Sequence, residues 1–182
     1  MSILDQTGFA GNDPEKVMKA VEEFMAAFER ESDLGDDVKA MIAGLKEGQT
    51  MAQMLGVSRD ELEVIYSVGF NLLNSGDLEK AKDVFTQLVM LDGIEAKYQY
   101  CLGYVFQQQG DYATAAKMYV NFLALDATNA EGYMRLGECL LASDERPEAL
   151  ECFEVAEAEA ARGNGSEATL ALARRNIAAL KG

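Results

Sequence analysis

The sequence of 182 residues contains no histidine. Its absence removes the side chain that proteins use most often as a general base and as a transition-metal ligand. Three cysteines occur, and none belongs to a C-x-x-C pair, which argues against a zinc site or a redox centre. We therefore expect no metal, no cofactor and no enzymatic activity. Small buried hydrophobic residues in a reducing compartment are the expected role of Cys101, Cys139 and Cys152.

Proline and long apolar runs are also scarce. The chain has only two prolines and is rich in Ala, Leu, Glu and Met, which favours helices. No run of 18 apolar residues occurs, so no membrane-spanning helix is predicted. The first residues lack the basic region and apolar core of a signal peptide. Together these features predict a cytoplasmic protein without membrane insertion.

Basic residues are few in comparison with acidic ones. The chain has 16 basic and 31 acidic residues, a net charge of −15 and an isoelectric point of about 4.3. This excess argues against binding to nucleic-acid phosphates or to an anionic membrane surface. A solvated acidic exterior is one interpretation, and a preference for a basic or apolar client is the other. Hydrophobic residues make up 49% of the chain, which indicates a folded protein.

Small and aromatic residues recur at a spacing of 34. The recurring residues are Gly69, Gly103 and Gly137; Ala81, Ala115 and Ala149; and Phe85, Tyr119 and Phe153. A period of 34 with small residues at fixed positions is typical of tetratricopeptide repeats, in which each repeat is a helix–turn–helix. We predict an all-α fold with three such repeats, at 62–95, 96–129 and 130–163, in a right-handed superhelical stack.

The segments outside the repeats have helical patterns of their own. Residues 1–61 are predicted to form an N-terminal extension and helical segment, and 164–182 a C-terminal capping helix on the repeat region 62–163. An amphipathic helix is expected to begin at Asp13 and Pro14. Its apolar face either covers the chain's own repeats or forms a dimer contact. The candidate dimer residues are Val21, Phe24 and Phe28.

The repeat register predicts which side chains line the concave face. In the first helix of a repeat, positions 2, 5, 9, 12 and 13 point into this face, whereas positions 4, 7, 8 and 11 pack internally. The candidate peptide-binding residues are Tyr66, Phe70, Leu73, Asn74, Lys97, Tyr100, Tyr104, Gln107, Met134 and Leu141. Aromatic rings with a polar group suit a surface that alternates between wet and bound. The alternative is that the N-terminal helices cover these rings.

Several stretches resemble a known family. Residues 45–51, 54–58 and 62–67 are similar to the start of the class II chaperones of bacterial type III secretion. Further matching stretches are 76–81, Phe85, 91–92, 102–103 and 138–141. The family is also similar in size, in acidity and in having three repeats after an N-terminal helical segment. The resemblance covers roughly residues 40–160, and the chain departs from the family in a longer N-terminal extension.

The resemblance implies a non-enzymatic chaperone in the bacterial cytoplasm. Such proteins bind hydrophobic translocator proteins through a short N-terminal client segment in the concave groove, and they often form dimers. The alternative is a general repeat scaffold or co-chaperone that grips a C-terminal carboxylate. That function needs a clamp rich in basic and amide groups. Only Lys97 is a basic residue among the predicted groove positions, which favours the secretion chaperone.

Overall fold

The computed structural model describes residues 35–182, and all regular structure in this range is helical. The helices are α3 (Asp36–Lys46), α4 (Met51–Met54), α5 (Arg59–Asn74), α6 (Leu78–Leu91), α7 (Ala96–Gln108), α8 (Tyr112–Leu125), α9 (Ala130–Ala142), α10 (Arg146–Ala161) and α11 (Glu167–Lys181). The amphipathic helix predicted to contain Val21, Phe24 and Phe28 lies outside the described residues.

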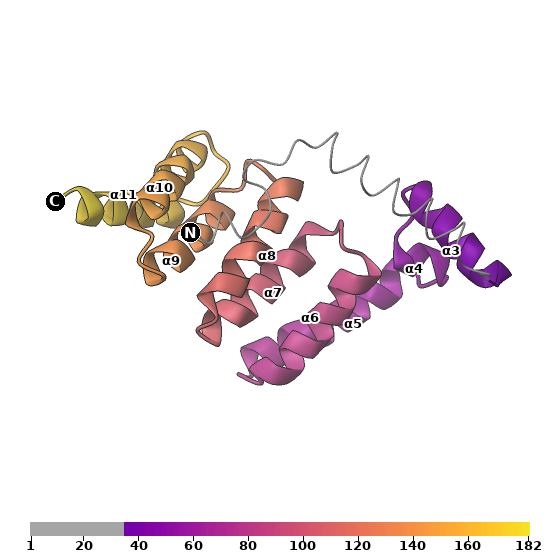
Figure 1. Cartoon of the computed structure of the whole chain (residues 1–182). Helices are drawn as coiled ribbons and strands as arrows, with labels where there is room; N and C mark the ends of the chain where they lie inside the picture. The colour runs from indigo at the N-terminus through magenta and orange to yellow at the C-terminus, as the bar shows by residue number, and fades with distance from the viewer. Residues whose placement is uncertain (1–34) are drawn as a thin grey trace.

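Three helical hairpins form the body of the molecule (Figure 1). They are α5–α6, α7–α8 and α9–α10, and each packs on the next through α6 against α7 and α8 against α9. Helices α3 and α4 lie at one end of the stack, and α11 packs on α10 at the other end. This arrangement confirms the predicted all-α repeat fold.

Polar side chains cap the first turns of several helices. Asp111 accepts a hydrogen bond from the Thr114 amide at 3.1 Å, and Asn129 accepts one from the Gly132 amide at 3.1 Å. These bonds satisfy amide groups that have no partner inside the helix. The turn of the third hairpin differs from the others, since Asp144 adopts a positive φ of 64°. The equivalent turns use glycine, which accepts this conformation without steric cost.

The recurring glycines mark close contacts inside each hairpin. A Cβ atom on Gly69 would lie 2.9 Å from a Val84 methyl carbon, and one on Gly103 would lie 3.1 Å from Met118 Cβ. A Cβ atom on Gly137 would lie only 2.6 Å from the Phe153 ring. The two helices of each hairpin therefore approach closely because these positions carry no side chain.

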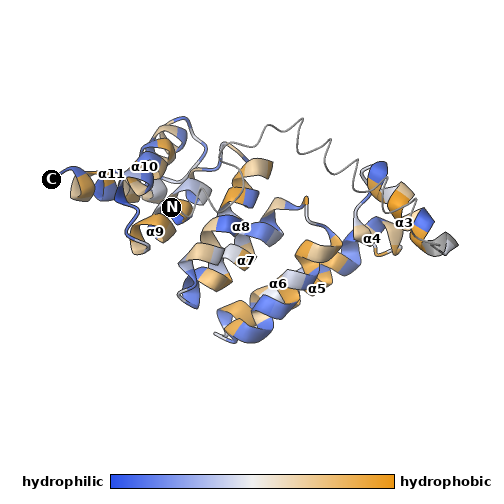
Figure 2. Cartoon of the chain, in the orientation of Figure 1, coloured by the Kyte–Doolittle hydropathy of each residue, from blue (hydrophilic) through white to orange (hydrophobic). Residues whose placement is uncertain are grey.

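Most buried apolar residues belong to one of two clusters along the stack. Each hairpin also contains hydrophilic residues between its hydrophobic ones (Figure 2). The N-terminal cluster comprises Ala52, Leu62, Ala81, Phe85, Leu88, Tyr98, Cys101, Leu102 and Val105. The C-terminal cluster comprises Ala115, Ala116, Tyr119, Phe122, Leu123, Met134, Leu136, Cys139, Leu140, Ala149, Cys152, Phe153, Ala156 and Ala173. All three cysteines are buried free thiols, as predicted. No helix within 35–182 is long and apolar enough to cross a bilayer.

Candidate peptide-binding groove

Two hollows of about 470 Å³ each adjoin the first helices of the three repeats. The first is lined by Tyr66, Phe70, Glu95, Ala96, Lys97, Tyr100, Cys101, Phe122, Asp126, Asn129 and Glu131. The second is lined by Phe70, Leu73, Asn74, Tyr100, Cys101, Tyr104 and Arg135. Because both hollows share Phe70, Tyr100 and Cys101, we treat them as one groove that runs over α5, α7 and α9.

Aromatic rings from α5 and α7 form much of the groove wall. Tyr66 stacks beside Phe70 with ring centroids 6.2 Å apart, and the Phe70 side chain is 44% exposed. Tyr100 packs edge-on against Phe122 at 5.2 Å, and burial raises the pKa of its hydroxyl. The Tyr66 hydroxyl lies 3.7 Å from Cys101 Sγ. These rings leave an apolar surface open to a partner while their inner edges are held by packing.

Lys97 is fixed at the edge of the first hollow. Its ammonium group forms an ion pair with Glu63 of the preceding repeat and lies 4.8 Å from the centre of the Tyr66 ring. A carboxylate and an aromatic face therefore both stabilise this cation. Its charge is already matched inside the protein.

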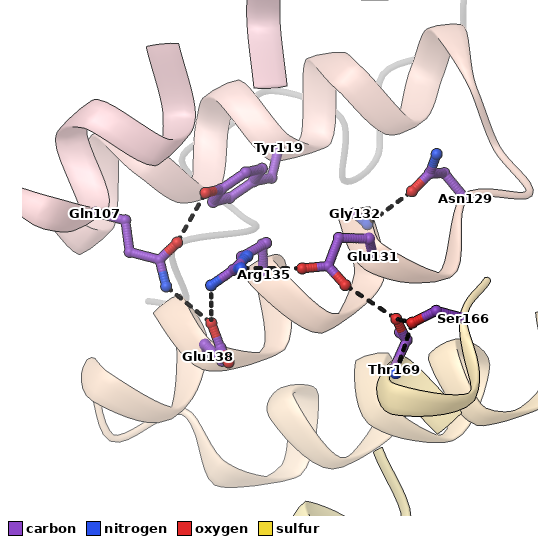
Figure 3. A network of polar contacts seen from close by, with 9 residues as sticks. All are labelled: Gln107, Tyr119, Asn129, Glu131, Gly132, Arg135, Glu138, Ser166 and Thr169. Carbon is purple, nitrogen blue, oxygen red and sulfur yellow. Dashed lines mark hydrogen bonds and ion pairs between the residues drawn. The ribbon is translucent and has the colours of Figure 1, made fainter. Parts of the chain in front are cut away.

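Arg135 of α9 contributes the polar part of the second hollow. Its guanidinium group is 3.0 Å from Glu131 Oε1 and 3.3 Å from Glu138 Oε2, and it lies 5.3 Å from the Tyr104 ring centre. Figure 3 shows this arginine between the two carboxylates. The arrangement presents one cation and two anions on a single face of α9.

Hydrogen bonds extend from this arginine site in both directions (Figure 3). On one side, the Tyr119 hydroxyl donates to Gln107 Oε1 at 2.7 Å, and Gln107 Nε2 donates to Glu138 Oε2 at 2.9 Å. On the other side, the Thr169 hydroxyl of α11 donates to Glu131 Oε2 at 3.1 Å. The two acidic side chains are therefore held in place from α7 and from the C-terminal helix.

The structure places seven of the ten predicted groove residues on the groove wall. They are Tyr66, Phe70, Leu73, Asn74, Lys97, Tyr100 and Tyr104. Gln107 belongs to the polar network instead, and Leu141 is half-buried against the C-terminal cluster. Met134 is only 2% exposed and lies inside this cluster, contrary to the prediction. The cluster encloses this position in the third repeat, and methionine has no polar group that must stay in water.

The repeat register missed several groove residues, among them Cys101 and Arg135. Cys101 and Arg135 occupy position 6 of their repeats, which was not among the positions taken to face the groove. Position 6 lies four residues after position 2 and therefore on the same helical face. Helical spacing alone could have identified both residues. The expectation that Lys97 is the only basic groove residue is wrong because Arg135 also lines the second hollow.

Fold and groove together define a tetratricopeptide-repeat protein with a groove over the first helices of its repeats. The tetratricopeptide repeat family matches residues 106–175. The low calcium response locus protein H of Yersinia pestis is 36% identical over 110 residues, which cover 60% of this chain and 66% of that protein. The chain thus spans slightly less than two thirds of this relative.

Solved structures agree with the sequence match. PcrH of Pseudomonas aeruginosa, bound to the chaperone binding region of PopD, superposes with a TM-score of 0.62 at 33% identity, over 69% of this chain and 92% of that one. The Yersinia enterocolitica type III secretion translocator chaperone SycD, in an alternative dimer, gives 0.66 at 29% identity, over 69% and 95%. The chain belongs to the family of type III secretion translocator chaperones, as its sequence motifs predicted, and this family is not enzymatic.

Proposed function

We propose that this protein is a bacterial cytoplasmic chaperone of a type III secretion system. It binds a hydrophobic translocator protein before export and keeps this client soluble and competent for secretion. The observation that carries the proposal is the groove, which runs over three repeats and whose wall contains aromatic rings from the first two. PcrH, which has the same fold, was solved with the chaperone binding region of PopD.

The shape of the groove favours an extended client segment. A rigid concave wall can hold alternate side chains in apolar hollows while the remaining ones stay in water. Phe70 and Tyr100 line both hollows, so successive apolar residues of one segment can contact them in turn. Large aromatic anchors of this kind usually supply most of the affinity at an interface.

The competing carboxylate clamp fits the groove less well. A clamp of this kind needs cations that are available to a client's terminal carboxylate. Lys97 is paired with Glu63, and Arg135 is paired with Glu131 and Glu138. A client carboxylate would have to displace these acidic side chains. The paired cations therefore favour a translocator chaperone over a general co-chaperone.

The experiment measures binding of a fluorescent peptide of the PopD chaperone binding region to the full chain. The variant Phe70→Ala with Tyr104→Ala removes two rings from the second hollow. Because an interface anchor is often worth ~2 kcal/mol, we expect affinity to fall roughly a hundredfold or more. Met90→Ala is the control, since Met90 is 72% exposed and lines neither hollow. Equal affinities for both variants would reject the groove as the binding site.

Self-association is a second part of the proposed function. SycD forms dimers in its crystal structure, and the predicted apolar face with Val21, Phe24 and Phe28 offers a contact of this kind. On α5, Val64 and Val68 are 65% and 48% exposed. An apolar helix face of this type is either a dimer contact or a surface covered by the chain's own N-terminal segment.

A further inference from the structure

The charged residues around the groove do not balance. Two basic residues line the hollows, Lys97 and Arg135. Three acidic residues line them as well, namely Glu95, Asp126 and Glu131. Glu63 and Glu138 pair with the two cations from the groove edge. The groove therefore has an excess of negative charge.

The α9 wall concentrates this imbalance in less than three helical turns. Glu131, Arg135 and Glu138 stand at i, i+4 and i+7, so they share one face of α9. The glutamate side chains are 38% and 35% exposed, and the arginine side chain is 28% exposed. The two carboxylates are therefore at least as accessible as the cation that they surround.

Both carboxylates are also held in position. Glu131 accepts one hydrogen bond from Thr169 and Glu138 accepts one from Gln107, in addition to their contacts with Arg135. Fixed anions attract a cation without first paying the entropy of ordering their side chains. A carboxylate brought to the same wall would instead approach two anions for every cation.

We propose that Glu131 and Glu138 set the charge preference of the groove. The client residue that lies against α9 is then neutral or cationic, and acidic residues are excluded there. This inference rests on the proposed function and names the chemistry of the client segment. Arg135 acts as a positioning residue that holds the two carboxylates apart and facing the groove.

The test uses the full chain and the PopD chaperone binding peptide. Each residue of the peptide outside its apolar anchors is replaced in turn by Lys, Gln and Glu. At one or two neighbouring positions we expect Lys to bind about fivefold tighter than Glu at low salt, and less so at high salt. The variant Glu131→Gln with Glu138→Gln should remove or reverse this ratio, because Arg135 then presents its charge to the client.

A matched control removes the same charge elsewhere. Glu154→Gln with Glu157→Gln neutralises two carboxylates on α10 that pair with Lys181 and Arg174, and it should keep the parental ratio. If both double variants lost the preference for Lys over Glu peptides to the same extent, net charge would explain the preference and the inference would be overturned. A parent that binds Lys and Glu peptides equally at every position would also overturn it. If no peptide binds at all, the proposed function fails as well.

Discussion

The two end walls of the groove are built differently. Helix α5 buries only Leu62 and Gly69, whereas α9 buries seven residues. Helix α9 lies between α8 and α10 and also contacts α11, whereas α5 packs on α6 and more lightly on α7. Repeats with the same register therefore acquire different burial, because the neighbours of a repeat in the stack decide which of its faces are covered.

This difference separates two kinds of surface within one binding groove. The α5 wall offers the exposed Phe70 ring, while the α9 wall offers charged groups held by hydrogen bonds to α7 and α11. The first can adapt to the shape of an apolar side chain. The second has fixed positions and selects by charge. Substitutions made separately in the N-terminal and C-terminal repeats will show whether the α5 and α9 walls contribute independently to stability and binding.

The largest expected effect comes from filling the close contacts inside the hairpins. Gly137→Leu should destabilise the protein more than Gly69→Leu, because a Cβ atom at 137 would lie 2.6 Å from the Phe153 ring, whereas one at 69 would lie 2.9 Å from Val84 and 3.1 Å from the Phe85 ring. Overpacking of this kind costs ~1–3 kcal/mol, and each kcal/mol lowers Tm by about 2–4 °C in a domain of this size. Thermal melts of both variants check the order. A lower Tm for Gly69→Leu would reverse the comparison.

A smaller effect is expected at the N-terminal end. Phe24→Glu with Phe28→Glu should change the oligomeric state more than the helix content, because it places charge on the apolar face that is predicted to form the dimer contact. Sedimentation velocity and circular dichroism on the same samples measure both quantities. The double variant Lys16→Glu with Lys19→Glu adds acidic residues near the same segment and is the control. If the double variant sediments as the same species as the parent, the dimer contact is excluded. The helix then covers the chain's own repeats.

The smallest effect concerns the thiols. Burial raises the pKa of all three thiols, to about 12 for Cys139 and Cys152, and Cys101 lines the groove. We expect Cys101 to be alkylated first, because the less covered N-terminal end opens more readily. Peptide binding should then slow its modification. Mass spectrometry of timed alkylation follows each site, and faster reaction of Cys139 would contradict the expected order.

The parts of the fold that could be predicted from the sequence are those marked by helix caps and turn residues. Helices α6 and α8 begin directly after Asp77 and Asp111, whose side chains cap their first turns. The capping box of Ser58 and Glu61 likewise lies at the start of α5. Caps and glycine turns depend on residues close in sequence, so they can be recognised without knowledge of the tertiary structure.

The candidate site was less predictable. Met134 shares its repeat position with Tyr66 and Tyr100 but is covered by residues of its own cluster. The role of Arg135 depends on Tyr104 from the preceding repeat and on two glutamates that α7 and α11 hold in place. Repeat register indicates which face a residue occupies. It does not indicate which neighbours reach that residue from elsewhere in the stack.

The residues that join the helices and the residues that line the groove occupy different positions of the 34-residue period. Gly137 and Phe153 pack one hairpin together, while Glu131 and Arg135 of the same hairpin line the groove and Glu138 pairs with Arg135. In evolutionary terms, substitutions that change the client and substitutions that change the fold fall on separate sites. A duplicated gene could therefore acquire a new client by altering a few exposed residues of α9 without first losing its stability.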